Sequence, residues 1–190
     1  MHRIILILVL ILLTTTITAC AGRTLAPMPE TELAAVGESS VTGQLGTFST
    51  SFKPGDDNGR DTNIKLATEA INGSVVSPGE EFSFNTTVGP TTQKRGYELA
   101  MIYVSGKKDE GYGGGVCQVS STLYNAAANA GMKIVERHDH SLPVLYVEAG
   151  KEAATSYGVK DFRFVNSLTK PVVIQSHVVD GTITVSICDV

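Results

Sequence analysis

One cysteine, Cys117, follows a run of glycines at the start of a predicted helix in the segment GYGGGVCQVSSTLYNAAANAG, residues 111–131. The backbone amides and the partial positive charge at a helix N-terminus favour a thiolate over a thiol, and the thiolate is the nucleophilic form. Glycines leave room for a substrate to approach backbone N–H groups, which can stabilise an oxyanion. Cys117 is therefore a candidate nucleophile. The alternative is a small buried hydrophobic residue beside a tight turn.

A nucleophilic cysteine needs a histidine as its base, and the chain contains four. His138 and His140 follow the helix in ERHDHSLPVLYV, whereas His2 and His177 lie near the two ends of the chain. If the segment is extended, His138 and His140 share one face, because side chains alternate along a strand. We expect His140 to be the base and His138 the reserve base. Two histidines that meet by chance on a hydrophilic strand are the competing interpretation.

Hydrophobic periodicity predicts the elements that must position these residues. Apolar residues at helical spacing indicate a helix that begins near Cys117 and ends at Gly131. A second helix is predicted over residues 63–72, and Tyr97–Val104 fits either a strand or a helix. Alternating patterns predict strands at residues 82–84, 162–165, 172–178 and 183–187, with a turn at Asp180-Gly181. The fold class is therefore α+β, with the Cys117 helix packed on an antiparallel sheet.

Several segments resemble the VanW family of bacterial envelope proteins, namely GGGVCQVSSTLYNAA, ERHDHSLPV, PGEEFSFNTTVGP and RGYELA. The resemblance runs from about Thr47 to Val190 and includes NGRDTNI, AINGSVVSPGE and YGVKDFRFVN. It implies a cell-wall context, because the family is linked by name to vancomycin-resistance clusters, but no particular activity. The chain departs from the family pattern at Glu152, a position more often held by Asp. This either weakens a catalytic role for residue 152 or means that the position accepts both acids.

A looser similarity is to transglutaminase-like cysteine enzymes, in which a GVC sequence opens a helix and a histidine and an acid follow on neighbouring strands. If residues 141–147 and 153–164 form a hairpin, the position opposite His140 is near residue 160, beside Asp161. The predicted triad is Cys117 as nucleophile, His140 as base and later acid, and Asp161 as the group that orients the imidazole. A surface aspartate that precedes a strand is the alternative for Asp161.

The glycine turn supplies the candidate oxyanion donors of such an enzyme. These are backbone amides around Gly114, Gly115 and Gln118, together with the Gln118 side chain. The turn lacks the GK[ST] sequence of a phosphate-binding loop.

Three classes of function fit these residues. The first is a Cys-His-Asp enzyme that transfers acyl groups or cleaves amides in peptidoglycan peptides, and the second is a non-catalytic module that binds the cell wall through the same cleft. The third is a metal site, because Cys117, His138 and His140 are three ligands that suit zinc. We favour the enzyme over the binding module and both over the metal site. Acyl chemistry at a helix-tip thiol needs no further ligand, so we expect neither a metal nor another cofactor.

The N-terminal residues predict where the protein resides. His2 and Arg3 precede an apolar run, residues 4–13, and Ile17-Thr18-Ala19-Cys20 resembles a lipobox, so residues 1–20 are predicted to be a lipoprotein signal peptide. The run is shorter than the roughly 20 apolar residues of a membrane span. We expect an extracytoplasmic protein anchored to the bacterial cell membrane by lipid on Cys20. Ordinary secretion after cleavage nearby is the alternative.

Composition indicates one globular domain and its partners. Residues 21–46 are rich in Ala, Gly, Thr, Pro and Glu and are predicted to be a flexible tether, and residues 47–190 are predicted to form the domain. The formal net charge is −4, and no basic run or aromatic platform suggests nucleic acid as a partner. The expected partner is peptidoglycan or another cell-wall peptide. We also expect Cys117 to be a free thiol and Cys188 to be a packing residue of the last strand.

The lipid anchor can be tested directly. We predict that Cys20→Ser releases the protein from the membrane, because the acylated residue is lost. Fractionation of cells checks the release, and mass spectrometry of the mature N-terminus checks the modification. Cleavage at another residue, with no lipid on Cys20, would contradict the prediction.

Overall fold

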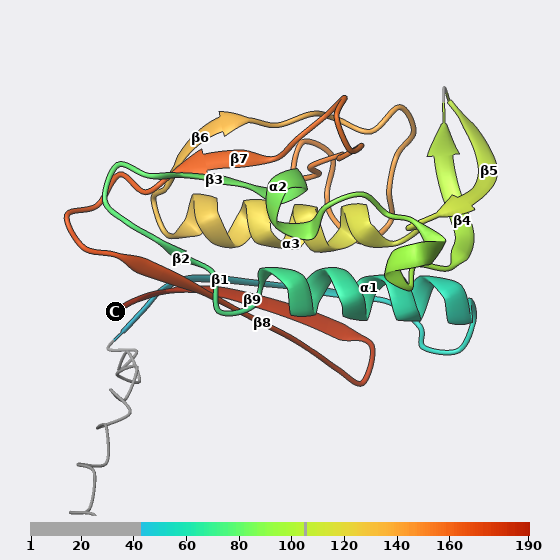
Figure 1. Cartoon of the computed structure of the whole chain (residues 1–190), viewed down its shortest axis with the longest axis horizontal. Coiled ribbons are helices and arrows are strands. Elements are labelled where there is room, and N and C mark those ends of the chain that lie inside the picture. Colours follow the sequence, from blue (N-terminus) through green and yellow to red (C-terminus); the bar gives the residue numbers. More distant parts are fainter. Residues whose placement is uncertain (1–42, 105) are drawn as a thin grey trace, which may run out of the picture. The chain divides into compact units, whose positions relative to one another are not determined.

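In the main sheet, the first and last strands of the described chain lie side by side (Figure 1). In this computed structural model, which describes residues 43–104 and 106–190, β1 (Gly43–Ser51) pairs antiparallel with β9 (Thr182–Asp189). Next to β9 lies β8 (Val172–Val179), and β2 (Val75–Val76) completes the order β1-β9-β8-β2. Asp180 and Gly181 both have positive φ, which suits a two-residue hairpin, so the predicted turn is confirmed.

Two helices cover one face of this sheet. The first, α1 (Asn58–Ile71), packs on β8, and α3 (Val116–Asn129) packs on β1 and β9. The sequence predicted the first helix only from residue 63. The structure begins it earlier, because the Asp57 carboxylate accepts a hydrogen bond from the Arg60 amide and caps the helix. Its partner α3 agrees with the predicted helix, and Gly131 follows it with φ +74°.

A smaller sheet lies on the opposite side of α3 (Figure 1). Its order is β3-β7-β6, with β3 at Glu81–Ser83, β7 at Arg163–Val165 and β6 at Lys133–Glu136. Phe82 of β3 stacks on Phe164 of β7 at a centroid distance of 5.2 Å. The strand expected at residues 82–84 is shorter, because α2 (Phe84–Val88) begins at Phe84 behind the Ser83 cap. The prediction of an α+β fold with the Cys117 helix on an antiparallel sheet is confirmed.

The third sheet is a two-stranded hairpin beside the N-terminus of α3. A short 3-10 helix, η1 (Gln93–Arg95), leads to β4 (Leu99–Val104), which pairs with β5 (Lys107–Tyr112). Residues 97–104 were compatible with a strand or a helix, and most of them form a strand. Leu99 and Met101 on the outer face are about half exposed, at 47% and 52%. The hairpin therefore projects from the body of the domain and forms one side of a pocket.

The long segment of residues 137–162 contains no strand, so the expected hairpin of residues 141–147 and 153–164 is wrong. Its backbone is instead bonded to polar side chains of α3. Asn125 donates to the Lys151 carbonyl, Ser121 accepts from the Ala153 amide and Ser120 donates to the Ala153 carbonyl. Buried backbone groups must find partners, and here they find them on a helix rather than in a ladder.

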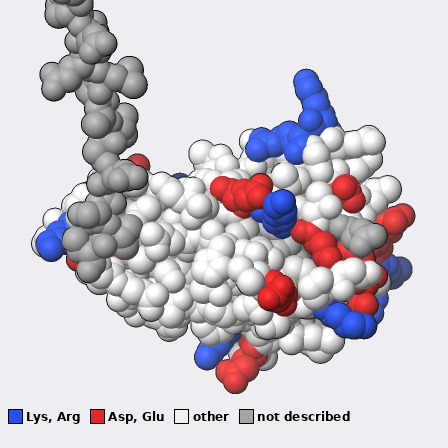
Figure 2. All heavy atoms as spheres, turned by 90° about the horizontal axis from the view of Figure 1, so that it is seen from below, with Lys and Arg blue, Asp and Glu red and all other residues white. Residues whose placement is uncertain are grey.

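Seen from below (Figure 2), a broad part of the surface carries no Lys, Arg, Asp or Glu, and charges of both signs gather toward one side.

Hydroxyl groups of neighbouring residues link the strands β1 and β9 of the main sheet. Ser49 bonds Thr184 at 2.9 Å, and Ser186 donates to Thr47 at 2.9 Å.

The expected domain boundary at residue 47 falls inside β1, which starts at Gly43. Residues 43–46 look like a linker by composition but pair with β9. The predicted signal peptide, Cys20 and the rest of the predicted tether lie outside the described residues. Within the described part of the chain, no helix has the length and apolar character to cross a membrane.

We predict that Gly46→Ala destabilises the domain by about 1–3 kcal/mol, as overpacking does. An added Cβ would lie 2.4 Å from the Ala130 nitrogen and 2.6 Å from the Ala126 carbonyl oxygen, so β1 would have to move away from α3. The control Gly43→Ala meets only the tip of the Asp189 side chain, at 2.9 Å, which can rotate away. Urea unfolding followed by circular dichroism compares the two variants. Equal stabilities would show that close contact at Gly46 is unimportant.

Candidate functional site

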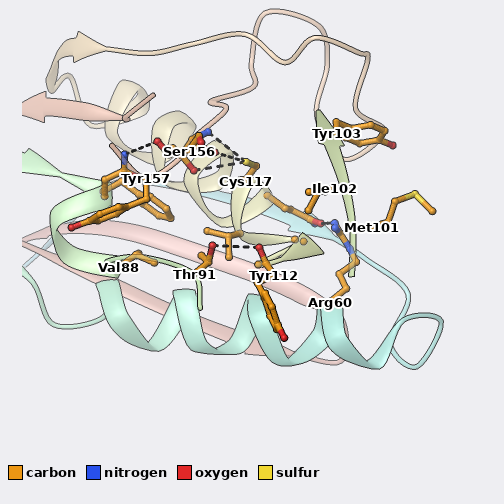
Figure 3. A pocket seen from close by; sticks show the side chains of 18 of the residues that line it. Arg60, Val88, Thr91, Met101, Ile102, Tyr103, Tyr112, Cys117, Ser156 and Tyr157 are labelled. Atoms are coloured by element: carbon orange, nitrogen blue, oxygen red, sulfur yellow. Dashed lines mark hydrogen bonds between the residues drawn. The ribbon is translucent and has the colours of Figure 1, made fainter. Parts of the chain in front are cut away.

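Cys117 opens onto a pocket of about 240 Å³ at the N-terminal end of α3 (Figure 3). Five parts of the chain line it: the glycine turn, α1 through Arg60, α2 through Val88, the β4–β5 hairpin through Ile102, and the 137–162 segment through His140 and Tyr146. In Figure 3, Cys117 lies between Ser156 and Tyr157 on one side and the hairpin on the other. The thiol therefore lies at the meeting point of several elements.

Contacts with α1 and β4 fix the glycine turn before Cys117. Gly113 and Gly115 have φ of +87° and +102°, which other residues rarely adopt. A Cβ on Gly114 would lie 2.5 Å from the Met101 carbonyl oxygen, so glycine allows β4 to approach the turn. Asn63 of α1 is fully buried and donates to the carbonyl oxygens of Gly114 and Glu98. The glycines thus serve close packing of neighbouring segments as well as access to the pocket.

Some of the predicted oxyanion donors are already engaged. The amide of Val116 donates to the Gly113 carbonyl at 3.1 Å, and that of Gln118 donates to the Gly115 carbonyl at 2.9 Å. The amides of Gly114, Gly115 and Cys117 have no acceptor among the residues described. Gly115 and Cys117 are at the helix tip itself, so their N–H groups are the candidate donors to an incoming oxygen.

The Gln118 side chain does not act as the free donor that we expected. It is buried, and its Nε2 donates to Thr50 Oγ1 and to the Ser51 carbonyl, both at 3.1 Å. Both amide hydrogens are thereby used. Its Oε1 accepts a hydrogen bond from Nη2 of Arg60 instead. Gln118 thus positions Arg60 at the pocket.

The Cys117 thiol contacts the backbone of Thr155. Its Sγ lies 3.4 Å from both the amide nitrogen and the carbonyl oxygen of Thr155, and 3.7 Å from the threonine hydroxyl. In the part of the chain that the structure describes, no hydrogen bond joins Sγ to a histidine. Cys117 and Cys188 are both free thiols, and Cys188 is buried in β9 at 2% exposure.

His140 lines the same pocket, and burial lowers its pKa below the ordinary 6.5. Nε2 of the ring lies 3.4 Å from the hydroxyl of Tyr146, and Nδ1 is buried without a hydrogen-bond partner in the described residues. Burial, and then the charge of Cys117, raises the pKa of Tyr146 well above its usual range, so the phenol stays neutral. The site therefore combines a thiol, a neutral imidazole and a neutral phenol.

Of the acids that act on His140, Glu152 has a larger effect than Asp139. After burial, the charge of Glu152 has the largest influence on the pKa of His140, which it raises. Its Oε2 is buried without a hydrogen-bond partner in the described residues, as is Nδ1 of His140. Arg137 holds the backbone here by donating to the carbonyl oxygens of Glu152 and Gly150 at 2.7 and 3.0 Å. The segment is thus fixed so that Glu152 acts electrostatically on the ring.

Asp161 has a different environment from the one predicted. Its carboxylate accepts hydrogen bonds from the Ser83 hydroxyl and from the amides of Asn85 and Phe162. The bonds with Ser83 and Asn85 support the capped N-terminus of α2, and Asp161 does not line the pocket. The predicted pairing with His140 depended on a hairpin that does not form.

His138 also lies away from Cys117. Its Nε2 bonds Oε1 of Glu136 at 2.8 Å, and this bond lowers the pKa of the Glu136 carboxyl. His138 does not line the pocket, so the three proposed zinc ligands are not brought together. Among the described residues, no group of three or more His, Cys, Asp or Glu side chains is arranged to hold a metal ion.

Among the pocket residues that sequence reasoning missed are Arg60, Tyr146 and Thr155. Arg60 lies within NGRDTNI, one of the segments that carried the family resemblance, and this was its only signal. Glu152 was noticed as a departure from the family pattern, but no role followed from it.

A family model described as VanW like protein matches residues 59–188. The chain belongs to the VanW family. It is 44% identical over 146 residues to the uncharacterized protein YoaR of Bacillus subtilis, an alignment that covers 77% of this chain and 48% of that protein. It is also 33% identical over 78 residues to the vancomycin B-type resistance protein VanW of Enterococcus faecalis, which covers 41% of this chain and 28% of that protein.

This VanW family member thus spans about half or less of the length of these curated relatives. No solved structure matches it, and the looser similarity to transglutaminases finds no support. The family match includes the whole range from Arg60 to Thr155, and therefore the glycine turn, Cys117, His140 and Glu152.

The two candidate acids can be distinguished through the histidine. We predict that Glu152→Gln lowers the pKa of His140 further, because the negative charge that favours the protonated ring is lost. Asp161→Asn should leave that pKa unchanged but lower the free energy of unfolding by about 1–2 kcal/mol, because a helix cap is weakened. NMR titration of the imidazole and thermal melts measure the two effects. A shift of the His140 pKa in Asp161→Asn alone would restore the triad that the sequence suggested.

Proposed function

We propose that this chain is a cysteine-dependent enzyme that transfers acyl groups from, or cleaves amides in, peptidoglycan peptides. The observation that carries the proposal is the placement of Cys117 as the second residue of α3, on a pocket that also contains the neutral His140 ring. At the same helix tip lie the amides of Gly115 and Cys117, which have no acceptor in the described part of the chain. A nucleophile, a base and oxyanion donors are the parts that acyl transfer needs.

The first step is attack of the Cys117 sulfur on an amide carbonyl. The thiol proton passes to Nε2 of His140, and the carbonyl oxygen becomes an oxyanion that accepts hydrogen bonds from the Gly115 and Cys117 amides. The Tyr146 hydroxyl, 3.4 Å from Nε2, is the group through which the proton can pass. Because its own pKa is raised, Tyr146 gives up one proton as it receives another and does not remain ionised.

The tetrahedral intermediate then collapses to a thioester. The C–N bond breaks, and the leaving amine takes the proton from Nε2 of His140. Water or an acceptor amine next attacks the thioester, with His140 as its base, and the thiol is restored. Glu152 stabilises the imidazolium in both halves of the reaction through its charge, the role first assigned to Asp161.

The setting that we propose is the outer face of the cytoplasmic membrane, with a lipid on Cys20 as the anchor. The supports are the order of charged, apolar and small residues at the N-terminus and the family membership of the domain. The printed name of the Enterococcus relative concerns vancomycin resistance. For this chain we propose only an association with the cell wall, the target of vancomycin. Cell-wall peptides are therefore the proposed substrates.

A non-catalytic module that binds cell-wall peptides is the second candidate. It is favoured by one observation, the hydrogen bonding of the Cys117 sulfur to Thr155 rather than to a histidine. In that case the thiol would anchor the 151–155 segment on α3, and the pocket would hold a peptide without chemistry.

The enzyme is tested by trapping the thioester. Intact-mass spectrometry of the mature protein with muropeptides should reveal an acyl adduct that is absent from Cys117→Ala, and His140→Ala should slow its formation at least about 100-fold. Cys188→Ala, which removes the other free thiol, is the matched control and should behave as wild type. The rate should rise with pH through the lowered pKa of His140, below 6.5, because only the neutral ring accepts the proton.

Two results would contradict this assignment. Turnover that persists in Cys117→Ala would remove the nucleophile. Binding of muropeptides by wild type with neither adduct nor turnover would leave the non-catalytic module as the function.

A further inference from the structure

Arg60 brings a positive charge to the pocket beside Cys117. It belongs to the first turn of α1 and lines the pocket, and its Nη2 donates to Oε1 of Gln118, the residue after the thiol (Figure 3). Gln118 cannot reorient, because both hydrogens of its Nε2 are bonded to Thr50 and Ser51. The guanidinium is therefore held in one place by a buried amide.

Packing against the glycine turn fixes the stem of the same side chain. A Cβ on Gly115 would lie 3.0 Å from Cγ of Arg60, so the aliphatic part of Arg60 lies against the turn that leads to Cys117. The charge also influences the catalytic end of the pocket, since Arg60 is one of the groups that lower the pKa of Tyr146 against the larger effect of burial. Arg60 is thus within electrostatic range of the proposed chemistry.

Among the residues that the structure describes, no acid pairs with this charge. In residues 43–104 and 106–190, no carboxylate forms an ion pair with Arg60, whose guanidinium bonds a neutral amide. Two other arginines of the domain are paired: Arg137 with Asp139, and Arg163 with Glu81 and Glu136. A half-buried guanidinium fixed by a neutral partner keeps N–H donors in the planar arrangement that matches a carboxylate.

We infer that Arg60 is a recognition residue that binds a carboxylate of the substrate peptide. The inference rests on the proposed function for the nature of the ligand. The carboxylate can be the C-terminal one or one on a side chain near the scissile amide, and both present the same pair of oxygens to the guanidinium. Binding it would place the neighbouring amide carbonyl at Cys117, so that recognition and chemistry share one pocket.

Binding to a protein that cannot turn over separates recognition from catalysis. With Cys117→Ala as the parent, calorimetry should give a Kd for a synthetic stem peptide with free carboxylates that rises about 10- to 100-fold in Arg60→Gln. Arg60→Lys should show an intermediate loss, because lysine keeps the positive charge but lacks the planar pair of N–H donors that binds both carboxylate oxygens. Lys65→Gln removes a charge from an exposed position of the same helix and should leave the Kd unchanged.

The peptides themselves distinguish the two sources of the carboxylate. Peptides amidated only at the C-terminus, or only at their side chains, should show which carboxylate Arg60 binds. The Kd of the peptide that lacks that carboxylate should no longer depend on Arg60. A fully amidated peptide should bind the parent and Arg60→Gln equally weakly. Gln118→Glu, checked for its fold by thermal melting, should also weaken binding of the free acid, because it gives Arg60 a carboxylate inside the protein.

Several outcomes would overturn the inference. One is equal loss of binding in Arg60→Gln for free-acid and fully amidated peptides, which would mean that Arg60 only shapes the pocket. Failure of the parent to bind the free-acid peptide is another. A wild-type protein that binds through Arg60 but never forms an acyl adduct would contradict the proposed enzyme and leave the recognition role standing.

Discussion

The site depends on a match between one face of α3 and the extended segment of residues 151–155. Four helical residues rise about 6 Å, and two extended residues rise about 6.6 Å. Side chains four apart on the helix, Asn125, Ser121 and Cys117, therefore meet backbone groups two apart on the segment, at Lys151, Ala153 and Thr155. This arrangement satisfies buried backbone groups without a strand partner. Cys117, the proposed nucleophile, is thus the last of three side chains on α3 that hold this segment in place.

The two neighbours of the thiol along the chain have separate tasks. Val116 is buried and continues the apolar face of α3, whereas the Gln118 side chain connects β1 and Arg60 of α1 through hydrogen bonds at both ends of its amide. The tip of the helix is thus joined to the main sheet and to the other helix. This explains how a turn of three consecutive glycines, which would be mobile in isolation, can hold N–H groups in a defined direction.

The candidate site was only partly predictable. The sequence indicated Cys117 at a helix tip and His140 near it, and the structure places both on one pocket. The predicted pairing of Asp161 with His140 was wrong because it assumed strand register. Residues 137–162 have no alternating pattern strong enough to form a hairpin, and their course follows the polar face of α3. Asp161, which is close to His140 in that assumed register, instead caps α2, while Glu152 acts on the ring.

The sequence by itself determined the helix that begins near Cys117, the β8–β9 hairpin at Asp180-Gly181 and membership of the VanW family. The helix and the hairpin depend on signals within a few neighbouring residues, such as apolar spacing and positions that require positive φ, whereas the family is recognised from segments spread over residues 59–188. Only the tertiary structure decided which charged residues share the pocket. Arg60 is 58 residues from Gln118 in the chain, and the two meet because α1 and α3 pack on the same face of one sheet. Such contacts follow from the packing of whole elements, which local spacing does not encode.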